Sequence, residues 1–283
     1  MVLRIGCCIT PHGFGHAARA AAVMEAVAKL VPAEFIIVTT VPRWFFSQSL
    51  SVPFSYNRLT TDVGLVQKSS LDEDMQATLR ALADFYPLAD ACIAHAVRLF
   101  STCDLIFCDI APLGIVTAER IGIPSLLIEN FTWDWIYARY LDEFQALEAH
   151  IDYLRQIYCR ANYHIQTAPV CRVTAGVKTV PPVSRSRRKT RAEIRRRLRV
   201  SDEDKLILIT MGGVVGDEYA VGPLQQEKAA VFVLAGKGAA VKIEGNIRLL
   251  AQDSTFYHPD LIAASDLVVG KTGYSTLAEV YSA

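Results

Sequence analysis

The sequence has no long apolar run, although 52% of its 283 residues are hydrophobic. A membrane-spanning helix needs at least about 18 apolar residues in a row, and no such stretch occurs. The N-terminus also lacks a basic segment followed by an apolar one, which a secretory signal would require. We therefore expect no transmembrane segment and a soluble, cytoplasmic protein.

An excess of charge of one sign is also missing, because 29 basic residues balance 29 acidic ones. A chain that is neutral as a whole gives no reason to expect a polyanionic partner. Cys-x-x-Cys pairs are absent as well, although the chain has 7 cysteines. An odd number of cysteines without that spacing favours a reducing compartment over a disulfide framework or a zinc site.

Apolar, β-branched runs alternate with helical patterns through the first part of the chain. We expect strands at Leu3–Ile9, Glu34–Thr40, Phe54–Leu59, Leu105–Asp109, Ser125–Ile128 and Tyr163–Gln166. The helical patterns cover His16–Leu30, Leu71–Phe100 with a break near Pro87, Gly114–Ile121 and Trp133–Arg155. This alternation is typical of a doubly wound parallel sheet. Its binding site should lie beyond the carboxyl ends of the strands, where five polar residues gather: His12, His16, Asp109, Glu129 and Asn130.

A second set of strands follows a plausible hinge at Thr179–Pro182. We expect strands at Leu206–Met211, Val231–Ala235, Ile247–Leu249 and Asp266–Gly270, with helices at Phe256–Ala264 and Tyr274–Glu279. The sequence therefore predicts an α/β protein of two Rossmann-like domains, residues 1–180 and 181–283. The second domain is expected to be truncated at its C-terminus, because such a domain usually continues with one or two further strand–helix units.

A basic segment, Arg185–Arg199, contains eight arginines and one lysine against a single glutamate. Basic runs can bind nucleic acid or anionic lipid. However, Ile194 and Leu198 have the i,i+4 spacing of a helix face, and an acidic stretch follows at 201–204. We favour a solvated amphipathic linker helix over a nucleic-acid site.

The segment Ser265–Glu279 predicts an anion site, because a strand, a glycine turn and a helix N-terminus follow one another. The free N–H groups and the positive dipole end of such a helix attract anions. Gly273 opens the turn, Lys271 adds charge, and Ser275 and Thr276 add hydroxyl donors. Glu279, about one turn further on, could accept hydrogen bonds from a ribose diol. An ordinary turn with a serine cap is the alternative.

Two other loops carry residues suited to the same chemistry. The loop Pro11–His16 places Gly13 and Gly15 next to His16, whose ordinary pKa near 6.5 suits a general base. Asp109 is the second candidate for the base. Helix capping is an alternative role for His16 and for Asp109.

The loop after the strand Leu206–Met211 contains Gly212 and Gly213, whose amide groups could cradle phosphate. It opens the same half of the chain that ends in Ser265–Glu279. The dinucleotide pattern G-x-G-x-x-G is incomplete at Ala18, so NAD binding is not expected.

These motifs resemble known families. Gly273, Ser275, Thr276 and Glu279 resemble the donor-binding segment of GT-B glycosyltransferases, especially the bacterial N-acetylglucosaminyltransferases that make lipid II. The stretch HGFGHAAR at 12–19 resembles the glycine–histidine loop of those enzymes. It is closer still to the GT-B-like module that precedes the sugar-kinase domain of plant arabinokinases.

The resemblance implies two domains facing across a cleft and a UDP-sugar as co-substrate, with no resident cofactor. The helix after Gly273 would hold the diphosphate, Glu279 the ribose, and the loop at His16 would meet the acceptor, a small or lipid-linked molecule. No Asp-x-Asp pair stands where a metal would bridge a diphosphate, so we expect a metal-independent hexosyltransferase. A non-catalytic sugar- or nucleotide-binding module and a UDP-sugar 2-epimerase remain the alternatives.

Overall fold

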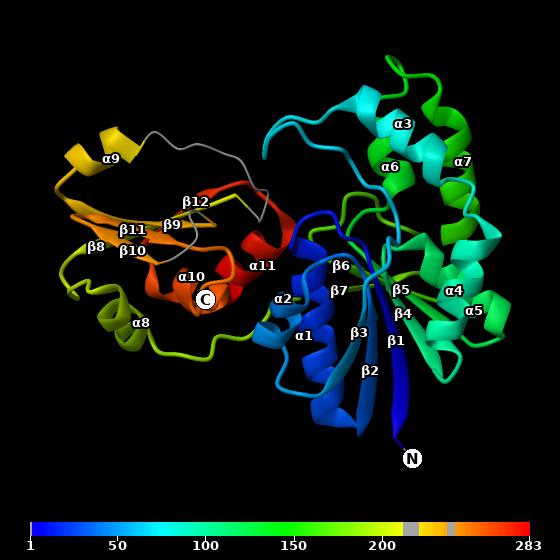
Figure 1. The fold of residues 1–283 in the computed structure, drawn as a ribbon, viewed down its shortest axis with the longest axis horizontal. Coiled ribbons are helices and arrows are strands. Elements are labelled where there is room, and N and C mark those ends of the chain that lie inside the picture. The colour runs from blue at the N-terminus through cyan, green and yellow to red at the C-terminus, as the bar shows by residue number, and fades with distance from the viewer. Residues whose placement is uncertain (1, 212–220, 237–240) are drawn as a thin grey trace. The chain divides into compact units, whose positions relative to one another are not determined.

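A computed structural model describes residues 2–211, 221–236 and 241–283 (Figure 1). The chain divides into two compact units, each with its own sheet. The first unit comprises Met1–Val66 and Glu73–Val183, and the second comprises Gln67–Asp72 and Ser184–Ala283. Both units are α/β and built on parallel strands, as the alternating sequence pattern predicts.

The first unit contains a seven-stranded sheet in which every neighbouring pair is parallel. Its order is β3-β2-β1-β4-β5-β6-β7. The strands are β1 (Leu3–Ile9), β2 (Ala33–Val38), β3 (Phe54–Asn57), β4 (Leu105–Asp109), β5 (Ser125–Glu129), β6 (Tyr163–Thr167) and β7 (Lys178–Val180). The order reverses between β1 and β4, and this switch point is where doubly wound sheets bind their ligands.

Helices cover both faces of this sheet (Figure 1). They are α1 (Gly15–Leu30), α2 (Arg43–Ser49), α3 (Met75–Phe85), α4 (Asp90–Phe100), α5 (Pro112–Ile121), α6 (Trp133–Ala138) and α7 (Leu147–Tyr158). Because neighbouring strand residues point to opposite faces, Cys7 joins the core beneath α1 and α2, whereas Cys8 joins the core beneath α4 and α5. Four alanines in the first half of α1 (Ala17, Ala18, Ala20 and Ala21) are buried against the sheet, which lets this part of the helix pack closely on it.

The second unit contains a five-stranded sheet of order β10-β11-β9-β8-β12. Its elements are α8 (Arg191–Leu198), β8 (Lys205–Thr210), α9 (Val221–Gln226), β9 (Ala230–Ala235), β10 (Lys242–Glu244), β11 (Ile247–Leu250), α10 (His258–Ala264), β12 (Leu267–Gly270) and α11 (Tyr274–Ser282). Among the described strands of this unit, β10 and β11 pair antiparallel and the other neighbours pair in parallel. Apolar side chains of α8 and α10 pack on β8 and β9 to form the main core of this unit.

Several elements differ from the sequence expectations. The basic segment is helical only from Arg191, because Thr190 and Glu193 form a capping box that starts the helix there. The expected helix Trp133–Arg155 is two helices, α6 and α7. Lys178–Val180, at the expected hinge, pairs with β6 as an edge strand.

The expected solvated character of the basic segment is wrong for two residues, Arg185, which pairs with Glu279, and Arg195. The side chain of Arg195 is 1% exposed and donates to the carbonyl groups of Ala264, Ser201 and Asp204. It also pairs with Asp266, which precedes β12. Arg195 therefore ties α8 to the segments before β8 and β12.

Among the described residues, no helix is both long and apolar enough to cross a membrane. In the same part of the chain, no group of three or more His, Cys, Asp or Glu side chains is placed to hold a metal ion.

Candidate functional site

The switch point of the first sheet brings His16 and Asp109 together. Asp109 is the last residue of β4, and β4 pairs in parallel with β1, so that Ile9 lies beside Asp109. The chain turns after β1 and enters α1 at Gly15, which places His16 in the first turn of this helix. His16 Nδ1 lies 2.7 Å from Asp109 Oδ1. Two residues 93 positions apart thus form one buried pair.

Arg19, one helical turn after His16, holds the other side of this carboxylate. Its Nε donates to Asp109 Oδ2 at 2.8 Å and its Nη2 donates to Oδ1 at 2.6 Å. Its Nη1 donates to Asn130 Oδ1 at 2.6 Å, which connects β4 to the end of β5. Such a two-pronged arginine–carboxylate contact is strong and geometrically specific. We refer to His16, Asp109 and Arg19 as the switch-point cluster.

The electrostatics of the switch-point cluster separate its two titratable groups. Burial lowers the pKa of His16 below its ordinary value, and this effect outweighs the opposing influence of the Asp109 carboxylate. Burial alone would raise the pKa of Asp109, but the charge of Arg19 and hydrogen bonds from Arg19 and His16 outweigh it, so the pKa ends lowered. At neutral pH the imidazole is therefore neutral and the carboxylate is ionised.

This protonation state makes His16 Nε2 the basic atom. An ionised Asp109 needs a donor at 2.7 Å, so the Nδ1–H tautomer satisfies it. Arg19 Nη2 also lies 3.3 Å from Nδ1, but the contact with the carboxylate is shorter and decides the tautomer. Within the described part of the chain, Nε2 makes no hydrogen bond, which leaves its lone pair available.

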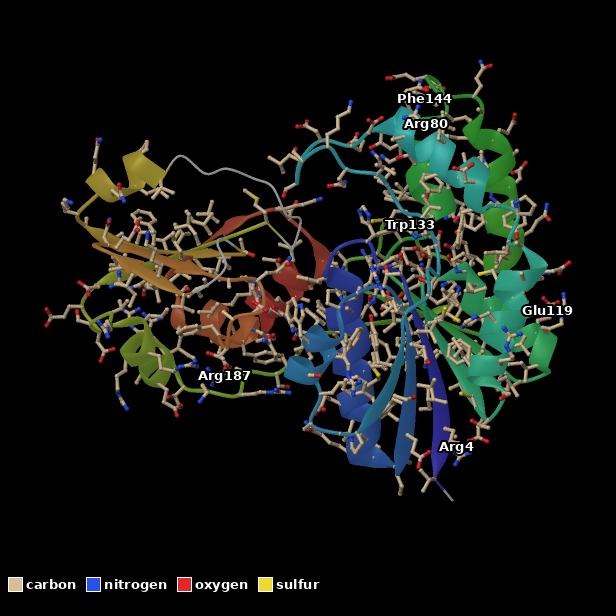
Figure 2. All side chains as sticks on the ribbon, in the orientation of Figure 1. Arg4, Arg80, Glu119, Trp133, Phe144 and Arg187 are labelled. Atoms are coloured by element: carbon tan, nitrogen blue, oxygen red, sulfur yellow. The ribbon has the colours of Figure 1, made fainter. Side chains whose placement is uncertain are left out.

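Aromatic side chains surround the imidazole. The His16 ring lies edge-on to Phe131, with centroids 5.6 Å apart, and Trp133 lies beyond at 6.3 Å. Trp133, labelled in Figure 2, is 1% exposed and belongs to the core. Its Nε1 donates to Asp62 at 3.0 Å, and its ring is edge-on to His12 at 5.1 Å. This aromatic packing restricts the orientation of the His16 ring.

Asp62 is a buried carboxylate that the sequence analysis missed. It accepts hydrogen bonds from Thr10 at 2.6 Å and from Trp133, and burial raises its pKa to about 7. Arg19 was also missed, although an arginine in a run of buried alanines, three residues after His16, was a usable signal. Asp62 follows no such pattern, because only the folded chain brings it beside Thr10.

The loop before α1 leaves a helix N-terminus open. Gly13 has a positive φ of 68°, a conformation that side-chain-bearing residues rarely adopt. Gly15 begins α1, and Phe14 at the N-cap makes no side-chain capping bond. The first N–H groups of α1 are therefore available to an anion.

Glu129, expected on the same rim, instead binds His164 and Gln166 of β6.

The second unit places Glu279 in a buried network. The carboxylate is 2% exposed, and its Oε1 accepts from Arg185 Nε at 2.9 Å. Oε2 lies 2.8 Å from His258 Nδ1, and His258 Nε2 lies 3.2 Å from Thr210 Oγ1. Burial acts to raise the pKa of Glu279, but the charge of Arg185 and the hydrogen bond from His258 hold it below its ordinary value.

The turn before α11 is open where an anion would approach. Gly273 is the N-cap of α11 without a side-chain capping bond, and a Cβ placed on it would meet nothing within 4 Å. Ser275 and Thr276 lie in the first turn of α11, and Lys271 lies half-buried just before it. The other two predicted phosphate-binding residues, Gly212 and Gly213, lie outside the described residues.

Comparison with known proteins supports the architecture. The chain is 30% identical to the L-arabinokinase of Arabidopsis thaliana over 285 residues, which cover 97% of this chain and 27% of that protein. The chain thus spans about a quarter of the length of this relative. No family model matches the sequence.

Among solved structures, spinosyn forosaminyltransferase SpnP superposes with a TM-score of 0.60 at 12% identity, covering 98% of this chain and 77% of that one. Arabidopsis thaliana UGT89C1 complexed with UDP-L-rhamnose superposes equally well, with a TM-score of 0.60 at 10% identity and coverages of 98% and 76%. With two Rossmann-like units in this order, the chain has the fold of the GT-B glycosyltransferases.

Proposed function

We propose that this chain is a glycosyltransferase that moves a hexosyl group from a UDP-sugar to an acceptor hydroxyl. The observation that carries the proposal is the switch-point cluster, in which a buried, ionised Asp109 orients a neutral His16. The fold supports it, because similar structures include one complexed with UDP-L-rhamnose. We further propose that the enzyme is cytoplasmic and that its acceptor is a small or lipid-linked molecule.

His16 acts as the general base in this proposal. Its Nε2 takes the proton of the acceptor hydroxyl, whose oxygen then bonds to the anomeric carbon of the sugar. The bond from that carbon to the diphosphate oxygen breaks, and UDP leaves with the electron pair. The positive charge that develops on the imidazole is stabilised by Asp109, 2.7 Å away. A positioned base of this kind contributes roughly 10²–10⁴-fold to a rate.

Asp109 is better placed as a positioning residue than as a second base. It is fully buried, and both of its oxygens accept hydrogen bonds from Arg19 or His16. An acceptor hydroxyl would have to displace Arg19 to reach it. Arg19 in turn keeps Asp109 ionised, so the arginine acts on the chemistry through the aspartate.

The donor side rests on α11 and the turn before it. The open N-terminus of this helix and Lys271 would hold the diphosphate, with Ser275 and Thr276 as hydroxyl donors. Glu279 is buried and already accepts from Arg185 and His258, so a ribose diol would share the carboxylate with these two residues or displace one of them. Glu279 thus contributes to the donor site either directly or by positioning His258.

A calorimetric titration with UDP, ADP, GDP and NAD tests the donor site, and a transfer assay tests the chemistry. We expect selective UDP binding that is unchanged in His16→Ala, while turnover in this variant falls by roughly 10²-fold or more. His95→Ala is the matched control, because His95 is an exposed residue of α4. Full turnover of His16→Ala would exclude His16 as the base.

A second candidate function follows from the arabinokinase relative. A chain that matches 27% of a longer kinase could serve as a non-catalytic sugar- or nucleotide-binding module. The same assays separate the two functions. The binding module would be favoured if the chain bound UDP but transferred sugar to no acceptor of a broad panel. His16→Ala would then change neither measurement.

A further inference from the structure

We propose that the first unit has a second ligand site, separate from the switch-point cluster, which binds a neutral monosaccharide unit. The site is a cavity of about 260 Å³ between α6, α7 and the β5–β6 edge of the sheet. This volume is below the ~300–1,000 Å³ typical of clefts for drug-sized ligands, so it suits a single sugar ring better than a nucleotide sugar. Its polar lining comes mainly from Glu129, Asp134, Arg155, His164 and Arg172.

The floor of the cavity contains the carboxylate of Glu129, and only one of its two oxygens accepts hydrogen bonds from described residues. Glu129 is 3% exposed, and its Oε1 accepts from His164 Nε2 at 2.9 Å and Gln166 Nε2 at 2.7 Å. Its Oε2 makes no hydrogen bond with any described residue. This oxygen is therefore left as an acceptor to which a ligand hydroxyl can donate.

The floor is also rigid, because Gln166 is fixed on three sides. Besides Glu129, its Nε2 donates to the carbonyl group of Arg172 at 2.8 Å, and its Oε1 accepts from the Thr174 amide at 3.0 Å. These bonds hold the loop after β6 against the end of β5. The acceptor atom of Glu129 is therefore held in place before a ligand arrives.

Asp134 and two arginines line another part of the cavity. Asp134 is 1% exposed, and its Oδ2 lies 3.3 Å from Arg172 Nη2 and 3.8 Å from Arg155 Nε. Its Oδ1 is buried without a partner among the described residues. Both guanidinium groups are about half exposed, at 50% for Arg155 and 53% for Arg172, so they retain N–H donors for a ligand.

Charge balance and the apolar walls identify the class of ligand. Arg155 and Arg172 both pair with Asp134, Arg155 also pairs with Asp152, and Glu129 adds another carboxylate to the lining, so no net positive charge is left to attract an anion. Aromatic rings of Phe131, Trp135 and Tyr158 complete the lining. Paired acceptors and donors around an apolar wall match the alternating hydroxyl groups and C–H faces of a sugar ring.

The cavity borders the switch-point cluster without including it. Phe131 lines the cavity and also contacts the His16 ring, so one side chain separates the two sites. A sugar in the cavity would leave His16 Nε2 free. Sugar binding and base catalysis can therefore be measured independently.

Calorimetric titration with D-glucose, D-galactose and L-arabinose, against D-glucuronate and D-glucosamine, tests the proposal. We expect saturable binding of at least one neutral sugar and weaker binding of its charged analogues. Glu129→Gln and Trp135→Leu should each weaken this binding by tenfold or more. Arg160→Gln is the matched control, because Arg160 is half-exposed and pairs with Glu119 outside this cavity.

The outcomes are distinct from those of the transfer assay. His16→Ala should bind the sugar as the unsubstituted chain does, which separates this site from the proposed base. Circular dichroism of each variant checks that the fold is retained, and Trp135→Leu tests the wall if Glu129→Gln unfolds the floor. Absence of saturable binding by every neutral sugar, or binding of a charged analogue alone, would overturn the proposal.

Discussion

At the residue scale, Asp109 determines which atom of His16 is basic. Replacing Asp109 with asparagine removes the carboxylate that raises the pKa of His16, while burial and Arg19 continue to lower it. The asparagine amide can also donate to Nδ1, which favours the tautomer whose Nε2 carries the proton. Asp109→Asn should therefore reduce kcat by roughly 10²–10⁴-fold without changing UDP affinity.

The pH profile of the same variant gives an independent readout. Transfer requires neutral His16, so kcat/KM should rise with pH through a pKa below the ordinary 6.5 of histidine. In Asp109→Asn this acidic limb should move to still lower pH, because an attraction for the proton has been lost. Asp84→Asn, an exposed position on α3, is the control. An unchanged limb would contradict the pairing of Asp109 with His16.

At the scale of elements, the basic segment shows what a local sequence pattern can predict and what it cannot. The i,i+4 spacing of Ile194 and Leu198 correctly indicated a helix with a buried face. Composition could not indicate that Arg195 is buried among carbonyl groups from two other segments, because these carbonyl groups lie 6 to 69 residues away. Local spacing predicts a helix face, whereas the partner of a buried charge depends on tertiary contacts.

Substitutions at two neighbouring arginines, one buried and one exposed, measure how much the buried charge contributes to the free energy of unfolding. Arg195→Met leaves buried carbonyl groups and Asp266 without their donor, which should cost about 3–5 kcal/mol of unfolding free energy. Arg196→Met removes the same charge from an exposed position and should cost within about 0.5 kcal/mol. Urea denaturation followed by circular dichroism compares the two. Equal, small losses would mean that Arg195 is not a structural tie.

At the scale of the whole molecule, the parallel sheets and the rim at the carboxyl ends of their strands could be predicted, whereas the contacts within the sites could not. Alternating strand and helix patterns indicate parallel sheets, and the rule for their binding edge brought His16, Asp109 and Asn130 to one rim. The contacts of Asp62 and Glu279 could not be predicted in this way. Asp62 is bound by Trp133, 71 residues away, and Glu279 by Arg185, 94 residues away. Such long-range partners carry no signature in local sequence.

In the proposed reaction, the second unit has to neutralise the negative charge of the leaving diphosphate. We expect no metal ion in the reaction, so the charge must be met by the open N-terminus of α11 and by Lys271. A hydrogen bond to a charged group contributes about 1.5–3 kcal/mol, so Lys271→Ala should weaken UDP binding by roughly 10–100-fold. Uridine, which has no diphosphate, should bind the variant as it binds the unsubstituted chain.

Turnover in the presence of EDTA completes this test. In the proposed metal-independent reaction, Lys271 and helix amides take the place of a metal ion, so chelation should leave kcat unchanged and added Mg²⁺ should not restore the activity of Lys271→Ala. Arg187→Ala provides the control, since it also removes one positive charge from the second unit but at an exposed position. Loss of activity with EDTA, recovered by Mg²⁺, together with a harmless Lys271→Ala, would show that a metal neutralises the diphosphate and that this turn does not.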